Sequence, residues 1–384
     1  MPSFSTVLHL SWLDSAKRLD LFLQAFRVTG LESWPSFGRS MPQLLASSQP
    51  TMSLGSREAE AWSRYWDKGL LHACASSFAN NHGGAIASFW REQLLKHCKP
   101  EQQVIDFGCG NGPIAMLLHD ELSDAPRYLG IDYAELHPQW LGRLRSEQRA
   151  RIRFLAPQDF RHLPFEADSA DWLVSQFGSE YGDLPLVLPE ALRVLKPSGT
   201  LLWLIHHEDS LIVRQAQEES AHIDFLRAEG GLIELATGLT EPFAMAKRAR
   251  VVRQLNNNKQ VIALRDRYNL CLDDLADRCS KCLVPDILLD TRDWVSQILQ
   301  GSRHEGAKAA KQRLVELDSL LADSKERLRQ LCKVAQSETS MRGALASVTN
   351  AGSAGTASAL NFELRQLQEA SATLAWTLKL AKSN

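Results

Sequence analysis

Residues 104–113 read V-I-D-F-G-C-G-N-G-P, a short apolar run that ends in an acid and three glycines. A glycine-rich turn after a strand occurs in several nucleotide-binding families. The dinucleotide fingerprint G-x-G-x-x-G would need a glycine where this chain has Pro113, so NAD is disfavoured. Asp106 would repel a pyrophosphate but attract an ammonium group. The turn therefore predicts a ligand that carries an amino group.

Strand-like and helix-like runs alternate through residues 101–207. Because repeated strand–helix units form parallel sheets, we expect a sheet covered by helices on both faces. The patterns predict strands at 103–107, 127–132, 151–155, 170–177 and 200–206, and a helix at 189–195.

The rest of the chain divides into four expected parts. They are a loosely ordered extension at 1–55, a core at 56–208, a helical insertion at 209–355 and a hairpin at 356–384, with strands at 361–367 and 373–380. Residues 58–97 have a helical, aromatic-rich pattern, and Met52 is an alternative start of the protein. Because strand patterns return only at the end, we expect the hairpin to complete the sheet.

The insertion contains heptad-spaced apolar residues interrupted at Ser324, namely Ala307, Ala310, Leu314, Leu317, Leu321, Leu328 and Leu331. This spacing predicts a long helix packed on another helix, within the chain or in a homodimer. Small residues at 350–359 suggest a hinge. The insertion is therefore expected to cover the active site or to mediate dimerisation.

The composition favours a globular protein with a small-molecule substrate. The chain has 384 residues, 44% of them hydrophobic, and a formal net charge of −2, so nothing in its charge favours nucleic acid or a membrane. Seven cysteines without a secretory signal or a long apolar run predict a cytoplasmic location with reduced thiols. Cys271, Cys279 and Cys282 lack a second paired cluster, so no metal site is expected. K-R-A-R at 247–250 fits a solvated helix face.

Asp132 ends the second expected strand in G-I-D, twenty residues after Gly112. In doubly wound nucleotide sites an acid at this place accepts the ribose hydroxyls. Asp132 is therefore a candidate ribose ligand.

Four ordered motifs now carry a resemblance. They are D-F-G-C-G-N-G at 106–112, G-I-D at 130–132, Q-D-F-R-H-L-P-F at 158–165 with S-A-D-W-L-V-S-Q-F-G at 169–178, and R-V-L-K-P-S-G-T-L at 193–201. Residues 101–207 resemble the class I S-adenosylmethionine-dependent methyltransferases. The resemblance implies an α/β fold with a doubly wound, mostly parallel seven-stranded sheet of order 3-2-1-4-5-7-6, one antiparallel strand, and S-adenosylmethionine as cofactor.

The resemblance also implies roles for individual residues. Asp106 and the turn at 108–112 would lie at the methionine moiety, Asp132 at the ribose and Asp159 at the adenine. Ser198 replaces a glycine that the family usually has, in a turn away from the cofactor. The full set of expected cofactor residues is Asp106, Gly108, Cys109, Gly110, Asn111, Gly112, Asp132, Tyr133, Gln158, Asp159, Phe160, Ser175 and Gln176.

Catalytic groups are expected in the loops at 175–181 and 205–210, at the carboxyl edge of the sheet. A sulfonium methyl needs an aligned acceptor and the removal of one proton, so a base is sought there. His206, His207 and Glu180 are the candidate bases. The two histidines face opposite sides of their strand, so one of them should face the cleft. Tyr181 is a candidate for orienting the acceptor, as is Trp66, for which packing is the alternative.

Known acceptor signatures are missing after the fourth strand. S-Q-F-G stands there instead of a Pro-Cys pair or the Asn/Asp-Pro-Pro-Tyr/Phe motif of enzymes that methylate bases. We therefore expect methylation of oxygen or nitrogen in a small molecule. The alternatives are methylation of RNA or protein, and a non-catalytic scaffold that only binds the cofactor.

Overall fold

The computed structural model describes residues 57–73, 81–351 and 360–382. The expected extension at 1–55 and most of the expected hinge at 350–359 lie outside these residues. The chain divides into two compact units, a helical unit within 218–325 and an α/β unit formed by 52–217 and 326–384.

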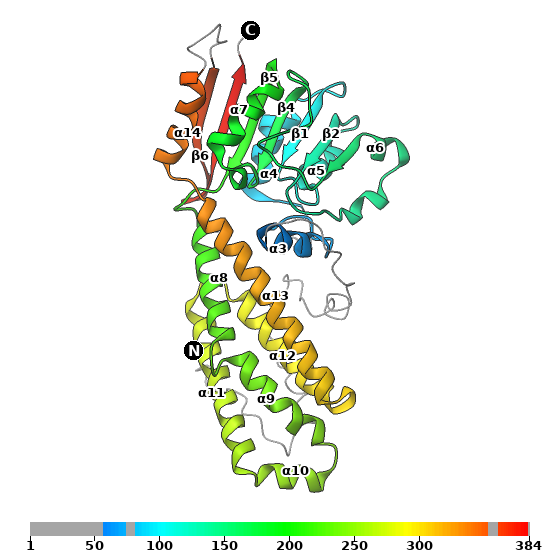
Figure 1. Ribbon diagram of the computed structural model, residues 1–384, viewed down its shortest axis with the longest axis vertical. Coiled ribbons are helices and arrows are strands. Elements are labelled where there is room, and N and C mark those ends of the chain that lie inside the picture. Colours follow the sequence, from blue (N-terminus) through cyan, green and yellow to red (C-terminus); the bar gives the residue numbers. More distant parts are fainter. Residues whose placement is uncertain (1–56, 74–80, 352–359, 383–384) are drawn as a thin grey trace. The chain divides into compact units, whose positions relative to one another are not determined.

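The α/β unit contains a seven-stranded sheet of order β3-β2-β1-β4-β5-β7-β6 (Figure 1). β7 runs antiparallel to both β5 and β6, whereas the other neighbours pair in parallel. The expected fold class and terminal hairpin are therefore confirmed. The strands are β1 (Gln103–Phe107), β2 (Arg127–Ile131), β3 (Ile152–Leu155), β4 (Ala170–Gln176), β5 (Leu195–Ile205), β6 (Leu360–Glu369) and β7 (Ala372–Lys382).

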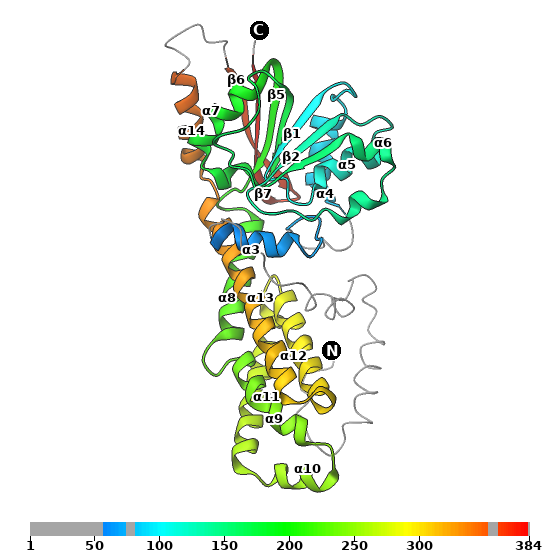
Figure 2. The same cartoon turned by 45° about the vertical axis from the view of Figure 1, so that its right-hand side comes forward.

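Helices cover both faces of the sheet (Figure 2). Side chains alternate along β5, so Leu201, Trp203 and Ile205 join one core while Leu202 and Leu204 join the other. The first core is closed by α7 (Leu184–Val194) and α14 (Glu338–Ala351), and the second by α4 (Gly84–Trp90), a π-helical turn η2 (Arg91–Leu95) and α5 (Pro113–Glu121).

Three elements differ from the sequence expectations. β5 begins at Leu195, earlier than expected. Residues 196–199, which were expected to form a turn, belong to the strand, and its pairing with β4 is irregular there. α7 begins at Leu184, ahead of the expected 189. α14 lies in the range assigned to the insertion, yet Met341, Ala344, Leu345 and Val348 form an apolar stripe that packs in the core of the sheet.

Shorter elements lie around the carboxyl edge. The aromatic-rich segment forms α3 (Arg57–Trp66) before α4. The connections contain η3 (Gln139–Arg143), α6 (Ser146–Ala150) and η4 (Ser179–Gly182).

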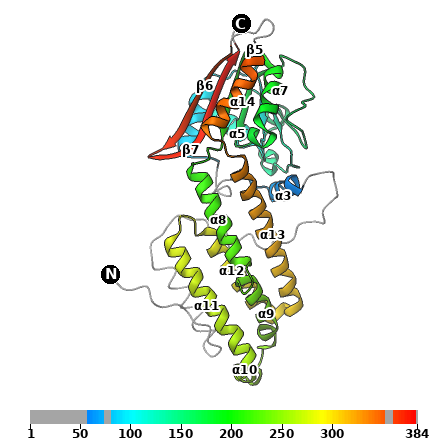
Figure 3. The same cartoon turned by 60° about the vertical axis from the view of Figure 1, so that its left-hand side comes forward.

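The remaining helices form or enter the helical unit, in which α9 packs against both α11 and α12 (Figure 3). Their bounds are α8 (Leu211–Arg227), α9 (Leu232–Met245), α10 (Ala249–Asn256), α11 (Lys259–Lys281), α12 (Asp286–Glu305) and α13 (Ala307–Val334). The heptad residues of α13 are buried from Ala307 to Leu321, and Leu328 and Leu331 are half-buried.

The chain leaves the sheet after β5 and returns to the same place at Gln336. The backbone N–H of Gln336 donates to the His206 carbonyl at 2.8 Å. The backbone carbonyl of Gln336 accepts from the backbone N–H of Glu208 at 3.1 Å and from the Trp376 indole N–H at 2.8 Å. Both ends of the insertion are thus fixed beside β5 and β7.

Candidate active site

The glycine turn (Gly108–Gly112) joins β1 to α5. Gly108, Gly110 and Gly112 have φ of 66°, 49° and 82°, in the left-handed region that favours glycine. The backbone N–H groups of Gly108 and Cys109 donate to the Ile131 carbonyl at 2.9 and 3.1 Å. The turn is thereby held against the end of β2.

Asp106 is buried below this turn, with 1% of its surface exposed. Its Oδ2 accepts from the Tyr128 hydroxyl at 2.5 Å, while Oδ1 has no hydrogen-bond partner among the described residues. Burial raises the pKa of Asp106 to about 8, although the bond from Tyr128 opposes the shift. A buried, unpartnered carboxylate oxygen fits the ammonium group of an amino-acid moiety.

Asp132 ties the glycine turn to the end of β2. Its Oδ2 accepts from the Gly110 N–H at 2.8 Å, and its Oδ1 from the Ala134 N–H at 2.9 Å. Burial raises its pKa to about 6. Because each carboxylate oxygen can accept two hydrogen bonds, the carboxylate retains the capacity to accept from a ribose hydroxyl.

Four residues of the expected cofactor set have buried side chains that pack or bond within the fold, namely Cys109, Asn111, Phe160 and Ser175. The Asn111 amide donates to the carbonyls of Trp66 and Leu70 at 2.9 and 2.7 Å and accepts from the His137 N–H, so its side chain is fully used. The Ser175 hydroxyl donates to the Phe107 carbonyl and accepts from the Ser179 N–H.

Cys109 and Phe160 are likewise buried, with 3% and 1% of their surface exposed. The Cys109 sulfur fills the space beside Gly130, and Phe160 packs on Phe107 and Tyr133. The side chains of Cys109, Asn111, Phe160 and Ser175 therefore support the site from within.

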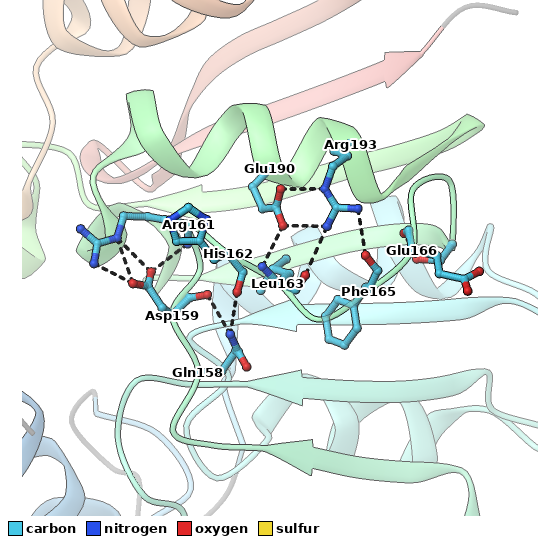
Figure 4. Close-up of polar contacts among 10 residues, drawn as sticks. Gln158, Asp159, Arg161, His162, Leu163, Phe165, Glu166, Glu190 and Arg193 are labelled. Carbon is cyan, nitrogen blue, oxygen red and sulfur yellow. Dashed lines mark hydrogen bonds and ion pairs between the residues drawn. The ribbon is translucent and has the colours of Figure 1, made fainter. Parts of the chain in front are cut away.

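The loop after β3 carries a polar network (Figure 4). The Asp159 carboxylate pairs with the Arg161 guanidinium and accepts from the Tyr133 hydroxyl. Arg161 holds the pKa of Asp159 well below its usual range. The Gln158 amide donates to the carbonyls of Asp159 and His162 at 3.0 and 2.8 Å.

Further along this loop, Glu190 and Arg193 of α7 fix the backbone at Leu163 and Phe165 (Figure 4). The loop is therefore ordered by its own side chains. Asp159 already has two partners, so any contact that it makes with an adenine would share its oxygens with them.

Glu180 lies in the loop after β4, with 3% of its surface exposed. Its Oε1 accepts from the His206 backbone N–H at 2.9 Å, and its Oε2 has no partner among the described residues. Burial raises the pKa of Glu180 to about 7. A carboxylate with this pKa can take up a proton near neutral pH.

The two histidines after β5 have different surroundings. His206 is buried and stacked on Phe177 at 4.4 Å, and burial lowers its pKa to about 3. His207 is stacked on Trp376 at 4.4 Å. Its Nδ1 accepts from the Asp209 N–H at 3.0 Å and its Nε2 contacts the Gln366 amide at 3.1 Å. Both ring nitrogens of His207 are therefore engaged in the fold.

An aromatic cluster of Trp62, Tyr65, Trp66 and Tyr181 lies beside the glycine turn. Trp62 stacks on Trp66 with ring centroids 5.6 Å apart and meets Tyr181 edge-on at 5.9 Å. A Cβ placed on Gly110 would lie 2.7 Å from the Trp66 ring. The cluster thus connects the glycine turn to the Glu180 loop.

Two residues from the far end of the insertion complete this cluster. The Arg327 guanidinium lies 3.9 Å from the Tyr65 ring centroid, and the Gln330 carbonyl accepts from the Trp62 indole at 2.9 Å. No sequence pattern predicts a place in the site for Trp62, Tyr65, Arg327 or Gln330.

A second group that no sequence pattern predicts lies at the end of β4. The rings of His72 and His82 stack at 3.9 Å, and His82 contacts the Gln176 amide. The Gln176 carbonyl accepts from the Trp90 indole at 2.6 Å. Burial, followed by the neighbouring His72, lowers the pKa of His82 to about 3. Gln176 is therefore held in place by two aromatic rings.

Residues 104–199 match the family model described as a methyltransferase domain. This match and the strand order confirm the expected family: the segment is a class I methyltransferase domain, the class that uses S-adenosylmethionine.

The relatives include two 2-phytyl-1,4-naphtoquinone methyltransferases. That of Synechococcus elongatus is 30% identical over 134 residues, covering 34% of this chain and 58% of the relative. That of Trichormus variabilis is 27% identical over 127 residues, covering 31% and 53%. The chain thus spans a little over half the length of these relatives.

Two solved structures match part of this chain. The YcgJ protein of Bacillus subtilis is 24% identical, with 35% of this chain and 57% of that chain covered and a TM-score of 0.27. Geranyl diphosphate C-methyltransferase of Streptomyces coelicolor is 20% identical, with 40% and 66% covered and a TM-score of 0.30.

Within the part of the chain that the structure describes, no helix has both the length and the apolar character needed to cross a bilayer.

Proposed function

We propose that this chain is an S-adenosylmethionine-dependent methyltransferase that acts on a small, flat acceptor. The observation that carries the proposal is the buried, unpartnered Oδ1 of Asp106 beneath the glycine turn of a methyltransferase domain. An ammonium group is the partner that would best satisfy this oxygen. The methionine moiety of the cofactor carries one.

The residues of the carboxyl edge fit such a cofactor. Asp106 would face its amino group, the backbone of Gly108–Gly112 would line its path, and Asp132 would accept from its ribose. The loop of Gln158 and Asp159 would border its adenine. When bound, the cofactor supplies an electrophilic methyl group on a sulfonium, so the chain's own residues have only to align the acceptor and to receive its proton.

Glu180 is the residue that we propose as the base. Its Oε1 is held by the His206 N–H, and its Oε2 remains to accept a proton. Burial brings its pKa to about 7, near the value at which a general base works best at neutral pH. His206, with a pKa lowered to about 3, is a much weaker base, and the ring nitrogens of His207 are already bonded.

The aromatic cluster supports a flat, apolar acceptor. Trp62 and Tyr181 are half-buried beside the Glu180 loop, and aromatic rings of this kind suit contact with a planar ring. The relatives from Synechococcus and Trichormus are named for a naphthoquinone, a planar apolar ring system. We therefore propose an acceptor of this shape whose oxygen or nitrogen loses a proton to Glu180. A cytoplasmic location and a homodimer formed through the insertion remain proposals from the sequence.

Calorimetry with S-adenosylmethionine and S-adenosylhomocysteine tests the cofactor site. We expect Asp132→Ala to weaken binding by about 1.5–3 kcal/mol, the range for hydrogen bonds to a charged group. Gly110→Val should weaken it further, because its Cβ would collide with Trp66 and its φ is 49°. Unchanged affinity in both variants would reject the site.

Turnover assays then separate the acceptor classes. Transfer of a labelled methyl group to reduced naphthoquinones or to phenols would support the proposal. Transfer only to RNA or to protein would reject the small-molecule acceptor and identify RNA or protein as the substrate. Cofactor binding with no transfer to any of these acceptors would favour a scaffold.

A further inference from the structure

Three metal-ligating side chains converge in the helical unit, in a group that the methyl-transfer site does not use. Glu218 and His222 lie one turn apart on α8, so their side chains share one face of that helix. Cys282 caps the C-terminal end of α11. A carboxylate oxygen, an imidazole nitrogen and the thiol sulfur all lie within 4.8 Å of one another.

His222 supplies a second, independent observation. Its side chain has 5% of its surface exposed, and neither Nδ1 nor Nε2 has a hydrogen-bond partner among the described residues. A buried polar group without a partner is costly, so such an imidazole is a reason to look for a missing ligand.

Glu218 is already oriented for binding. One of its oxygens, Oε2, accepts from the backbone N–H groups of Leu283 and Val284 at 2.8 and 3.0 Å. These two residues directly follow Cys282, so the same loop positions both the carboxylate and the thiol. Backbone bonds that orient a ligand in this way are common around metal sites.

Among the described residues, Cys282 makes only weak contacts through its thiol. Its thiol contacts the Cys279 carbonyl at 3.7 Å, a weak interaction, and the residue is half-buried, so an ion could reach it. Arg278 of the same helix lies over the Phe225 ring at 4.3 Å. Burial is the main cause that lowers the pKa of His222, Glu218 opposes this shift, and the charge of Arg278 adds to it.

We propose that Glu218, His222 and Cys282 form a zinc site with a water molecule in the fourth position. Zinc accepts mixed thiolate, imidazole and carboxylate ligands, and two anionic ligands would balance its charge. Tetrahedral coordination would draw the ligand atoms to about 3.4–3.6 Å from one another, a small side-chain adjustment. The thiol loses its proton to solvent as the Zn–S bond forms, so binding releases a proton.

Zinc titration of the metal-free full-length chain against a chromophoric chelator tests this site. We expect one equivalent to bind. Cys282→Ser and His222→Gln should each weaken binding by at least about tenfold. Cys279→Ser is the matched control, because this thiol lies one turn earlier on α11 and outside the group, and it should retain the full equivalent.

Cobalt substitution identifies the ligand directly. The sulfur-to-cobalt charge-transfer band should appear in the native chain and in Cys279→Ser, and should vanish in Cys282→Ser. Circular dichroism of each variant shows whether it has folded, and Glu218→Gln, which retains one carbonyl acceptor, provides a third ligand change. Failure of the folded native chain to bind zinc would overturn the site. Equal losses in Cys279→Ser and Cys282→Ser, or undiminished binding in His222→Gln, would overturn it as well.

Discussion

Gly108 and Gly178 lie with their main chains in direct contact. A Cβ on Gly108 would lie 2.4 Å from the Gly178 Cα, and a Cβ on Gly178 would lie 2.6 Å from the Gly108 Cα. The turns after β1 and β4 therefore approach as closely as two backbones can. This approach brings the glycine turn and the loop that carries Glu180 into one site.

Gly178→Ala should destabilise the fold by about 1–3 kcal/mol, the usual cost of overpacking. Gly178 has φ of −134°, which any residue can adopt, so the cost arises from the contacts of the added Cβ with the Phe107 carbonyl oxygen and with Gly108. The free energy of unfolding in guanidinium measures it. Gly142→Ala is the control, because no atom of the residues that the structure describes would lie within 4 Å of a Cβ there. Equal stability of the two variants would contradict the contact.

Asn111→Ala should release the C-terminal end of α3 from the glycine turn. The change leaves the Leu70 carbonyl without its amide donor, whereas the Trp66 carbonyl keeps the bond from the Gly69 N–H. A buried unsatisfied group costs about 1–3 kcal/mol. Hydrogen exchange of residues 57–70 should accelerate more than exchange of the sheet strands. Asn361→Ala, at an exposed position on β6, should change neither. Normal protection of α3 in Asn111→Ala would show that this tie is dispensable.

Glu180→Gln should flatten part of the dependence of stability on pH. Burial raises the pKa of Glu180 from 4.5 to about 7, so the folded state favours the protonated form. The stability that this group contributes is fully present below pH 4.5 and is lost as the pH rises towards 7. The difference amounts to about 3 kcal/mol. Thermal unfolding of both proteins between pH 4 and 8 measures it.

The same substitution tests the proposed base. In the native chain kcat/KM should rise with pH through about 7, as Glu180 ionises. Glu180→Gln should lower turnover by about 10²-fold and remove this rise, with little change in cofactor affinity. If the variant retained native turnover and the native pH profile, Glu180 would not be the base and another group would have to take up the proton.

The two histidines after β5 should differ in what their loss affects. His207→Ala removes a ring stacked on Trp376 and bonded to the Asp209 N–H, so it should lower stability by about 1–3 kcal/mol with little effect on turnover. His206→Gln should alter turnover more than His207→Ala does, since His206 lies beside Glu180 and Phe177. Turnover and unfolding are measured for both variants. If His207→Ala lowered turnover more than His206→Gln did, His207 and not His206 would act in the reaction.

The sheet could be predicted because its signals are local. Each βα turn lies within a few residues of its strand, and the glycine spacing after β1 selects one class of turn. The start of β5 could not be predicted, because Pro197 and Gly199 normally mark a turn. In the structure both residues lie in the strand, where its pairing with β4 is irregular.

Side-chain direction was harder to predict than position. Membership of a motif places Cys109, Asn111 and Ser175 near the cofactor, but it does not tell whether each side chain faces the ligand or the core. All three face inward. The Trp62 contact with Gln330 joins residues 268 positions apart, and no periodic pattern in the sequence encodes such a pair.

The anchoring of Gln336 beside His206 and Glu208 has an architectural consequence. Both ends of the insertion are held next to the same pair of strands, so the residues between them form one long connection between β5 and the rest of the sheet. The entropy cost of closing such a connection changes only slowly with its length. Such a module could be exchanged, shortened or lost without rethreading any strand. A version trimmed to a short linker would keep the sheet and forfeit the Arg327 and Gln330 contacts to α3, so the cost of losing the module would fall on the aromatic cluster rather than on the fold.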